Sequence, residues 1–410
     1  MNENIRIENA LWGLFISDAI SMPAHWYYSL DYLKKDFGAI DSYLDAPHPH
    51  PESFMAGSSY YPDVLKAKEL GRPYDILHDH IRFYNTSFSR FSIQTTEHAG
   101  EHANAMPTLN ERFHYHHGLK AGENTLAANL VRVLIRSVIA QGDYDQDAFL
   151  KDFIAYLSTP GINRDPYSEI YVRAWFENYT SGLAPELCAQ KQRSVWSIGS
   201  HGGIIRPLVL SIFAKEPYQG LGLALSHQQL THRSENVSSA LGVLIPLLHA
   251  LIKGNEPLET IQKYGQRVRL IKITGEELSK TYRAHNVPGN IPKNQMWKIH
   301  TEFSNQYLDV NHLLEAYSDE EIIGKRFATA CYPEHGVPLM LCLLQRNKAD
   351  FRTSILANAN AGGDNVHRGM ILGLLAGACN ADIPSELKSG LFAYHELKNE
   401  ISEFVHLLQR

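Results

Sequence analysis

The 410-residue chain lacks the features that mark disulfide-stapled, zinc-ribbon or nucleic-acid-binding proteins. It has only four cysteines, and they are dispersed, so the sequence predicts neither a disulfide framework nor a cysteine-based zinc site. The formal net charge of −6 provides no broad electrostatic attraction to nucleic acid or to an anionic membrane. We therefore expect neither of these as a partner.

A long apolar run and a signal-like N-terminus are also missing. We find no apolar segment that reaches the roughly 18 to 20 residues needed by a membrane-spanning helix. The first residues, MNENIRIENALWG, include no basic stretch followed by an apolar one, which argues against a signal peptide. These absences predict a cytoplasmic protein.

Alternating apolar and polar runs, which are typical of β-strands, are scarce, whereas helical periodicity is frequent. Apolar residues recur at steps of three and four over residues 7–19, 125–141, 238–253, 337–345 and 366–379. The sequence therefore predicts an all-α fold, with a single compact multi-helix domain over 1–410. The segment 45–118 is rich in proline, histidine and aromatic residues and interrupts the helical pattern, so we interpret it as an inserted lid.

Two polar clusters lie beside predicted helix ends in the first third of the chain. The first, SDAISMPAHW at 17–26, contains Asp18 and His25. The second, GENT at 122–125, places Glu123, Asn124 and Thr125 directly before a strongly apolar helix. Helix capping and local hydrogen bonding by themselves explain these residue types, and a ligand site is the alternative.

A third cluster, GSHGGIIR at 199–206, is rich in glycine. Its backbone N–H groups can cradle an anion, because several residues tolerate unusual backbone angles just before an apolar run. The candidate binding residues of this loop are Gly199, Ser200, His201, Gly202 and Gly203.

The fourth cluster opens the segment NANAGGDNVHRGMILGLLAGA at 358–378. Its two glycines, Gly362 and Gly363, form a turn that lets the side chains of Asp364, Asn365 and His367 converge. In the helix that follows, glycines recur every four residues and form a groove against which another backbone can pack closely.

The order and approximate spacing of these four clusters resemble the ADP-ribosylglycohydrolase family, the group of the dinitrogenase-reductase-activating and crystallin-J1-like proteins. The resemblance spans residues 7–378 and implies an all-α fold and hydrolysis of a glycosidic bond in ADP-ribose or a related ribosyl nucleotide. It also implies two divalent cations, Mg²⁺ or Mn²⁺, held by carboxylates of the second and fourth clusters. A small molecule or an ADP-ribosylated substrate is the implied partner.

The chain departs from the family pattern at the metal-binding positions. His25 replaces a glutamate, Glu123 and Asn124 replace two aspartates, and Val366 and His367 replace an aspartate and a threonine. The carboxylates at the matched positions fall to Glu123 and Asp364, which suit one divalent ion better than two. The expected cofactor is one divalent metal, Mg²⁺ or Mn²⁺, with Zn²⁺ or Fe²⁺ not excluded. The added histidines shift the site towards a borderline metal such as Zn²⁺, Mn²⁺ or Fe²⁺, or towards acid–base chemistry with no metal.

The resemblance assigns roles residue by residue. The candidate catalytic groups are Glu123, Asp364, His25 and His367, and the candidate metal ligands are Glu123, Asn124 and Asp364. The candidate substrate-binding residues are Asp18, Asn124, Thr125, Gly199, Ser200, His201, Gly202, Gly203, Gly362, Gly363 and Asn365. A hydrolase is the leading interpretation; a catalytically silent binder of ADP-ribose or another sugar nucleotide and a structural protein of the crystallin type are the alternatives.

A competing motif lies in the predicted insertion. Residues 98–102, HAGEH, fit the H-x-x-E-H pattern of some zinc peptidases. That motif needs a helix, which Gly100 weakens, and a chance match is easy in a chain with 21 histidines. We favour a polar, pocket-lining segment that includes Glu97, His114, His116 and His117, and a surface tract is the alternative.

Overall fold

The computed structural model describes residues 2–48, 50, 58–84, 113–191, 199–266, 268 and 308–409. The H-x-x-E-H stretch at 98–102 lies outside the described residues. The described flanks of the predicted insertion are bonded to the body: Ala46 N donates to Leu119 O, and the Tyr84 hydroxyl donates to Pro166 O. The division into one domain with an insertion at 45–118 stays a prediction.

The all-α prediction is confirmed: the described residues form helices and contain no β-strand, only the isolated bridges Val268–Leu308 and Ile323–Phe327. The elements are α1 (Glu3–Ser21), η1 (Met22–Ala24), α2 (Leu30–Phe37), α3 (Val64–Glu69), η3 (His78–Phe83), α5 (Leu126–Gln141), α6 (Gln146–Ser158), α7 (Ile170–Thr180), η6 (Pro185–Lys191), α9 (Gly202–Ser211), α10 (Pro217–Gln228), α11 (Glu235–Ile252), α12 (Pro257–Gly265), α15 (Val310–Ala316), α16 (Asp319–Ile322), α17 (Pro333–Arg346), α18 (Phe351–Asn360), α19 (Asn365–Cys379), α20 (Ser385–Ser389) and α21 (Tyr394–Leu407).

The five predicted helices are all present, with boundaries that the capping residues explain. The first begins at Glu3, because the Asn2 side chain accepts a hydrogen bond from Ile5 N. The fourth begins at Pro333, where a proline loses no intrahelical hydrogen bond. Apolar periodicity therefore predicts the buried turns of each helix, whereas local capping interactions determine where the helix begins and ends.

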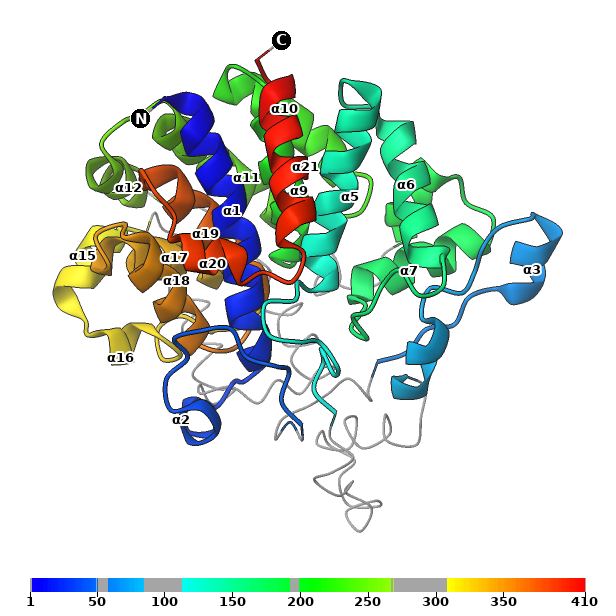
Figure 1. Ribbon diagram of the computed structural model, residues 1–410, viewed down its shortest axis with the longest axis horizontal. Coiled ribbons are helices and arrows are strands. Elements are labelled where there is room, and N and C mark those ends of the chain that lie inside the picture. The colour runs from blue at the N-terminus through cyan, green and yellow to red at the C-terminus, as the bar shows by residue number, and fades with distance from the viewer. Residues whose placement is uncertain are drawn as a thin grey trace.

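Helices α1 and α19 pack antiparallel at the centre of the protein, with α18, α9, α11 and α17 against α19 (Figure 1). Backbone meets backbone along this contact. A Cβ on Gly373 would overlap Gly13 O and the Ser17 hydroxyl, and a Cβ on Gly377 would overlap Asn9 O. The predicted glycine groove is thus occupied by α1, and only glycine fits there.

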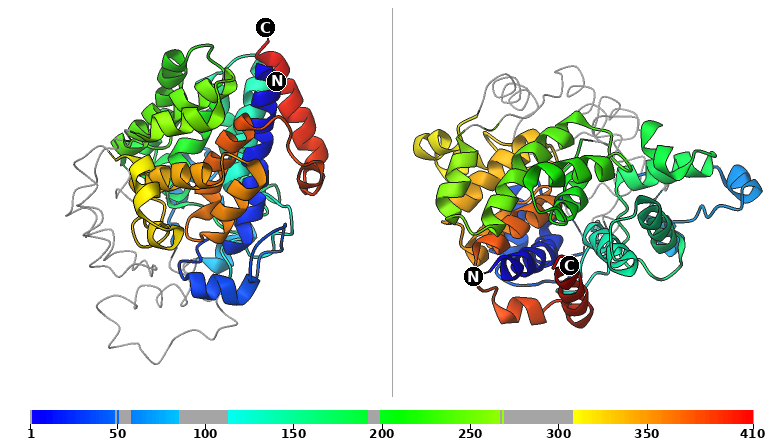
Figure 2. Two further views of the ribbon diagram at one scale, coloured as in Figure 1. Left: turned by 90° about the vertical axis from the view of Figure 1, so that its left-hand side faces the viewer. Right: turned by 90° about the horizontal axis from the view of Figure 1, so that it is seen from above.

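This packing fixes which ends of the two helices meet. Helix α1 begins and α21 ends at the same end of the molecule, whereas α3 projects to one side (Figures 1 and 2). Since α1 and α19 are antiparallel, the C-terminal end of α1 lies beside the N-terminal end of α19. The first and fourth polar clusters are therefore neighbours.

Helix α11 is longer and more apolar than the sequence predicts. Among the described residues, α11 (Glu235–Ile252) is long and apolar enough to cross a membrane, which corrects the expectation that no segment reaches that length. However, 61% of it is buried inside the protein, as is typical of a core helix.

The glycine contact makes a prediction about stability. Gly373→Ala should lower the free energy of unfolding by about 1–3 kcal/mol, because the methyl group must push two tightly packed backbones apart. Gly242→Ala is the matched control: Gly242 is an exposed α11 residue with no atom near its would-be Cβ, and alanine there should be neutral or stabilise by up to about 1 kcal/mol. Urea unfolding measures both, and an equal response would contradict the packing argument.

Candidate functional site

Three of the four predicted clusters meet at one buried carboxylate, Asp364, the N-cap residue of α19. His25 Nε2 and His367 Nδ1 lie 3.1 and 2.6 Å from its Oδ1, and His201 Nδ1 lies 2.8 Å from its Oδ2. We call these four side chains the Asp364 centre. Because a carboxylate accepts hydrogen bonds, each of the three imidazole nitrogens that face it donates an N–H.

The turn at Gly362 and Gly363 holds Asp364 in place. Both glycines have positive φ, +61° and +65°, and a Cβ on either would overlap a backbone carbonyl. Gly363 N donates to Tyr27 O, and Trp26 N donates to Gly363 O. The turn is therefore bonded directly to the loop that carries His25.

A fully buried arginine, Arg368, completes this support. Its guanidinium donates to Asn358 Oδ1 and to the backbone carbonyls of Thr329 and Gly362. Asp364 N donates to Thr329 O as well. The carboxylate is thus positioned by backbone on both sides, which leaves its two oxygens for the histidines.

Charge within the centre is concentrated on Asp364 and His367. Burial by itself would raise the pKa of Asp364, but the charge of His367 and hydrogen bonds from His201 and His25 hold it well below its usual value. Burial likewise lowers the pKa of His367, yet Asp364 and Glu169 together raise it well above the ordinary value. The pair is an ionised carboxylate and an imidazolium.

Glu169 lies on the other side of His367. Its Oε1 is 3.3 Å from His367 Nε2, and it is the N-cap residue of α7. A Cβ on Gly202 would collide with the Glu169 carboxylate, so this glycine gives the side chain room at the start of α9. The glycine-rich loop therefore lies next to the Glu169 carboxylate.

A second chain of contacts leaves the centre through His25. His25 Nδ1 lies 2.6 Å from His116 Nε2, and His116 Nδ1 lies 2.9 and 3.0 Å from the two oxygens of Asp165. One proton must lie between His25 Nδ1 and His116 Nε2, because two lone pairs at that distance would repel. Burial lowers the pKa of His25 well below its usual value despite the hydrogen bond to Asp364.

The second cluster is bound to the first through Asp18. The Asp18 carboxylate accepts from the Thr125 hydroxyl, from Thr125 N and from the Asn124 side-chain amide. Asp165 accepts from the next backbone amide, Leu126 N. Two buried carboxylates therefore satisfy the N-terminal N–H groups of α5.

Several helix N-termini converge on this region. Asp364, His201, Glu169 and Thr125 are the N-cap residues of α19, α9, α7 and α5. The positive end of each helix dipole favours negative charge nearby. The arrangement stabilises the buried carboxylates and suits an anionic ligand.

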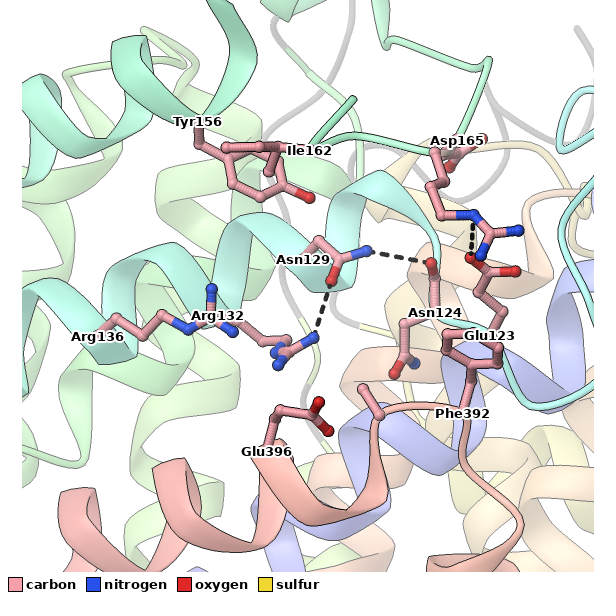
Figure 3. A pocket seen from close by; sticks show the side chains of 12 residues that line it. Glu123, Asn124, Asn129, Arg132, Arg136, Tyr156, Ile162, Asp165, Phe392 and Glu396 are labelled. Atoms are coloured by element: carbon pink, nitrogen blue, oxygen red, sulfur yellow. Dashed lines mark hydrogen bonds and ion pairs between the residues drawn. The ribbon is translucent and has the colours of Figure 1, made fainter. Parts of the chain in front are cut away.

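Glu123 faces a different space, a cleft of about 320 Å³ between α5, α6 and the segment that leads into α21 (Figure 3). Its carboxylate accepts from Lys120 N and pairs with Arg164 at 3.1 Å. Asn124 also lines the cleft, and its buried Oδ1 has no hydrogen-bond partner. Among the described hydrogen bonds and ion pairs, none joins Glu123 or Asn124 to Asp364.

The structure thus brings together some of the predicted site residues and separates others. His25, His201, His367 and Asp364 form one centre, with Gly202, Gly362 and Gly363 shaping it. Asp18 and Thr125 form a capping cluster, while Glu123 and Asn124 border the cleft. Asn365 donates its side-chain amide to Ala359 O and leaves its buried Oδ1 without a partner. Gly199 and Ser200 lie in the turn before His201, and Gly203 packs under the His232 ring.

Two carboxylates of the network, Asp165 and Glu169, were missed in the sequence. They lie four residues apart in NRDPYSE, a stretch without glycine clusters or apolar periodicity that would single it out. His116 was expected only as part of a polar segment. The sequence offers only a weak signal for these two residues: Asp165 precedes a proline, and Glu169 lies just before a helix.

The donor set of the Asp364 centre is suitable for one divalent cation. His25, Asp364 and His367 each offer a ligand atom, and these atoms lie within 4.8 Å of one another. Two imidazoles and one carboxylate match borderline metals such as Zn²⁺, Fe²⁺ or Mn²⁺ better than the oxygen-only shell that Mg²⁺ prefers. Val366 is buried in the core and provides no ligand.

Removing the Asp364 charge should change the protonation of His367. In an Asp364→Asn variant the pKa of His367 falls towards its ordinary value, because the carboxylate that stabilises the imidazolium is gone. A pH titration of the imidazole signals by NMR measures this. Asp18→Asn is the control, since Asp18 makes no hydrogen bond to His367, and an equal shift in both variants would contradict the assignment.

Comparison with known proteins shows the family and the fold of the chain. The family model described as ADP-ribosylglycohydrolase matches residues 2–410. A solved structure described as an ADP-ribosylglycohydrolase-related protein complex has a similar fold, with a TM-score of 0.53, 14% sequence identity and 99% of each chain covered. No curated protein matches the sequence. The match to the family model extends over almost the whole chain, and the protein belongs to the ADP-ribosylglycohydrolase family.

Proposed function

We propose that this protein hydrolyses the glycosidic bond of a ribosyl nucleotide of the ADP-ribose type, with the Asp364 centre and Glu169 as its chemical groups. Membership of the family supports a glycohydrolase-type function. The observation that carries the proposal is the meeting of three histidines from separate segments on one buried, ionised carboxylate. A structural protein has no need of such a costly polar centre.

The charge of the network supports glycosidic cleavage. Asp364 and Glu169 contribute two carboxylates, and the imidazolium of His367 contributes one positive charge. The remaining negative charge is suited to stabilise the oxocarbenium-like sugar that forms as a glycosidic bond breaks. The converging helix N-termini are suited to bind the phosphates of a nucleotide.

His367 and Glu169 are placed to act as acid and base. His367 holds a proton at neutral pH because its pKa is raised, and it gives this proton to the departing group as the C–N or C–O bond breaks. Water adds to the anomeric carbon and passes its proton to Glu169. The C–N or C–O bond to the departing group breaks and a C–O bond to water forms at the same anomeric carbon. His367 donates one proton and Glu169 accepts one.

A divalent cation would be held by His25, Asp364 and His367. When bound, such an ion supplies Lewis-acid stabilisation and orients sugar hydroxyls. Borderline metals fit these ligands best. Acid–base chemistry by the same side chains is the alternative where no cation binds.

Turnover provides the direct test. We expect the protein to release free ADP-ribose or a related ribosyl nucleotide from at least one N- or O-linked substrate. Chromatography of the reaction mixture measures this product. Glu169→Gln removes the base, and Asp364→Asn removes the carboxylate that keeps the acid His367 protonated. Each should lower kcat by about 10²–10⁴-fold, the usual contribution of a positioned acid or base. Glu400→Gln, which alters a carboxylate on α21 that pairs with Arg132 and Arg136 of α5, is the control that should keep kcat.

Product formation decides between this function and a silent receptor. Binding of ADP-ribose without any product from the substrate panel would contradict hydrolysis and favour a sugar-nucleotide binding protein. Equal losses of activity in Glu400→Gln and Asp364→Asn would point to general destabilisation instead.

The affinity for a cation should rise with pH. Ligation by His367 Nδ1 requires loss of a proton that Asp364 and Glu169 hold more tightly than usual, so the proton still competes above the ordinary imidazole pKa. The Kd for Zn²⁺ should fall by about tenfold per pH unit while His367 is protonated. Isothermal calorimetry on chelator-treated protein between pH 6 and 8 measures this; a Kd that is independent of pH would exclude His367 as a ligand.

A further inference from the structure

We propose that Asp165 and His116 form a positioning relay that fixes the ring of His25, so that His25 Nε2 is presented to a divalent cation at the Asp364 centre. The proposal rests on the part of the proposed function that makes His25, Asp364 and His367 the cation-holding group. It gives a role to two buried polar side chains that the hydrolytic steps do not use.

The contacts of the relay connect side chains from four separate segments of the chain. Asp165 contacts His116 Nδ1 with both oxygens, His116 Nε2 contacts His25 Nδ1, and His25 Nε2 contacts Asp364. All four side chains are buried, at 2% exposure or less. The rings of His25 and His116 are nearly parallel, with an angle of 10° between their planes.

Asp165 is itself held rigidly, which makes it a suitable anchor. Its Oδ2 accepts from Leu126 N at 2.7 Å, and its Oδ1 accepts from Tyr167 N at 3.0 Å. With its carboxylate fixed by two backbone amides, His116 must direct Nδ1–H towards it. The other ring nitrogen of His116 then faces His25.

Aromatic side chains prevent the two rings from turning. Trp26 stacks on His25 with ring centres 4.8 Å apart, and Trp26 has an unusual positive φ of 67° that the pairing with Gly363 maintains. The edge of Tyr167 packs against both rings, at 6.1 Å from His25 and 5.9 Å from His116. The orientation set by Asp165 is therefore transmitted to His25.

The relay matters because a histidine can bind a cation only through a nitrogen without a proton. When His25 Nε2 is the ligand, its proton must be on Nδ1, and His116 Nε2 is the acceptor for it. Outer partners of this kind fix the tautomer and raise the basicity of a ligating imidazole, and their loss usually weakens metal binding 10- to 100-fold.

A purely structural role for Asp165 is the alternative, because Asp165 also caps α5. Asp18 provides the matched comparison. Both are buried aspartates that accept from adjacent N-terminal amides of α5, Leu126 N for Asp165 and Thr125 N for Asp18, but only Asp165 contacts His116. Loss of a cap should affect stability in both variants, and loss of the relay should affect cation binding in one.

The test measures cation binding directly, without substrate. Zn²⁺ and Mn²⁺ are titrated by isothermal calorimetry into the chelator-treated full chain as wild type, Asp165→Asn, His116→Gln and Asp18→Asn, with melting temperatures recorded for each. We expect Kd to rise 10- to 100-fold in Asp165→Asn and His116→Gln and less than about twofold in Asp18→Asn. If His116→Gln does not fold, Asp165→Asn, which keeps the size of the side chain, carries the comparison.

Each other outcome overturns the relay. Unchanged Kd in Asp165→Asn, an equal loss in Asp18→Asn, or no cation binding by the wild type would each do so. Failure of the proposed hydrolysis is a separate result: a wild type that binds cation and depends on Asp165, yet forms no product from any substrate, would exclude the enzyme and retain the relay.

Discussion

The close antiparallel packing of α1 against α19 is the constraint on which the rest of the structure depends. Glycines at 13, 373 and 377 remove the side chains that would separate the two backbones. This contact sets the register between the helices and brings the loop after α1 to the turn before α19. His25 and Asp364, 339 residues apart in the chain, then lie within hydrogen-bond distance.

The Asp364 centre shows how a buried polar network can be supported. Helix N-termini point towards it, an arginine and backbone amides hold the Asp364 turn, and each carboxylate of the network contacts at least one histidine. Removing a single member would leave an unpaired buried charge, which costs far more than an exposed ion pair contributes. Such a network is rigid because each side chain is held by hydrogen bonds or ion pairs to the side chains next to it.

Histidine gives this family member a different chemical character from the carboxylate pattern that it resembles. Where the pattern has oxygen ligands for hard cations, the chain offers two imidazoles and one carboxylate, and further carboxylates lie one contact away as partners of those imidazoles. If the site holds a cation, the exchange moves negative charge away from direct contact with it and places that charge beside the ligating imidazoles. It also makes proton placement a central property of the site.

The sequence by itself determined the helical class, the principal helices and the glycine groove, because these depend on local periodicity and on residues with special backbone freedom. The order and spacing of the clusters also predicted that polar residues of all four clusters meet in space, with Glu123 and Asn124 beside Asp364. Only the tertiary structure decided that Glu123 faces a cleft beside Arg164, and that Asp165 and Glu169 join the network. Those contacts connect segments with no periodic or glycine-rich signature, so their physical cause is the packing of α5, α7 and α9 around the central helix pair.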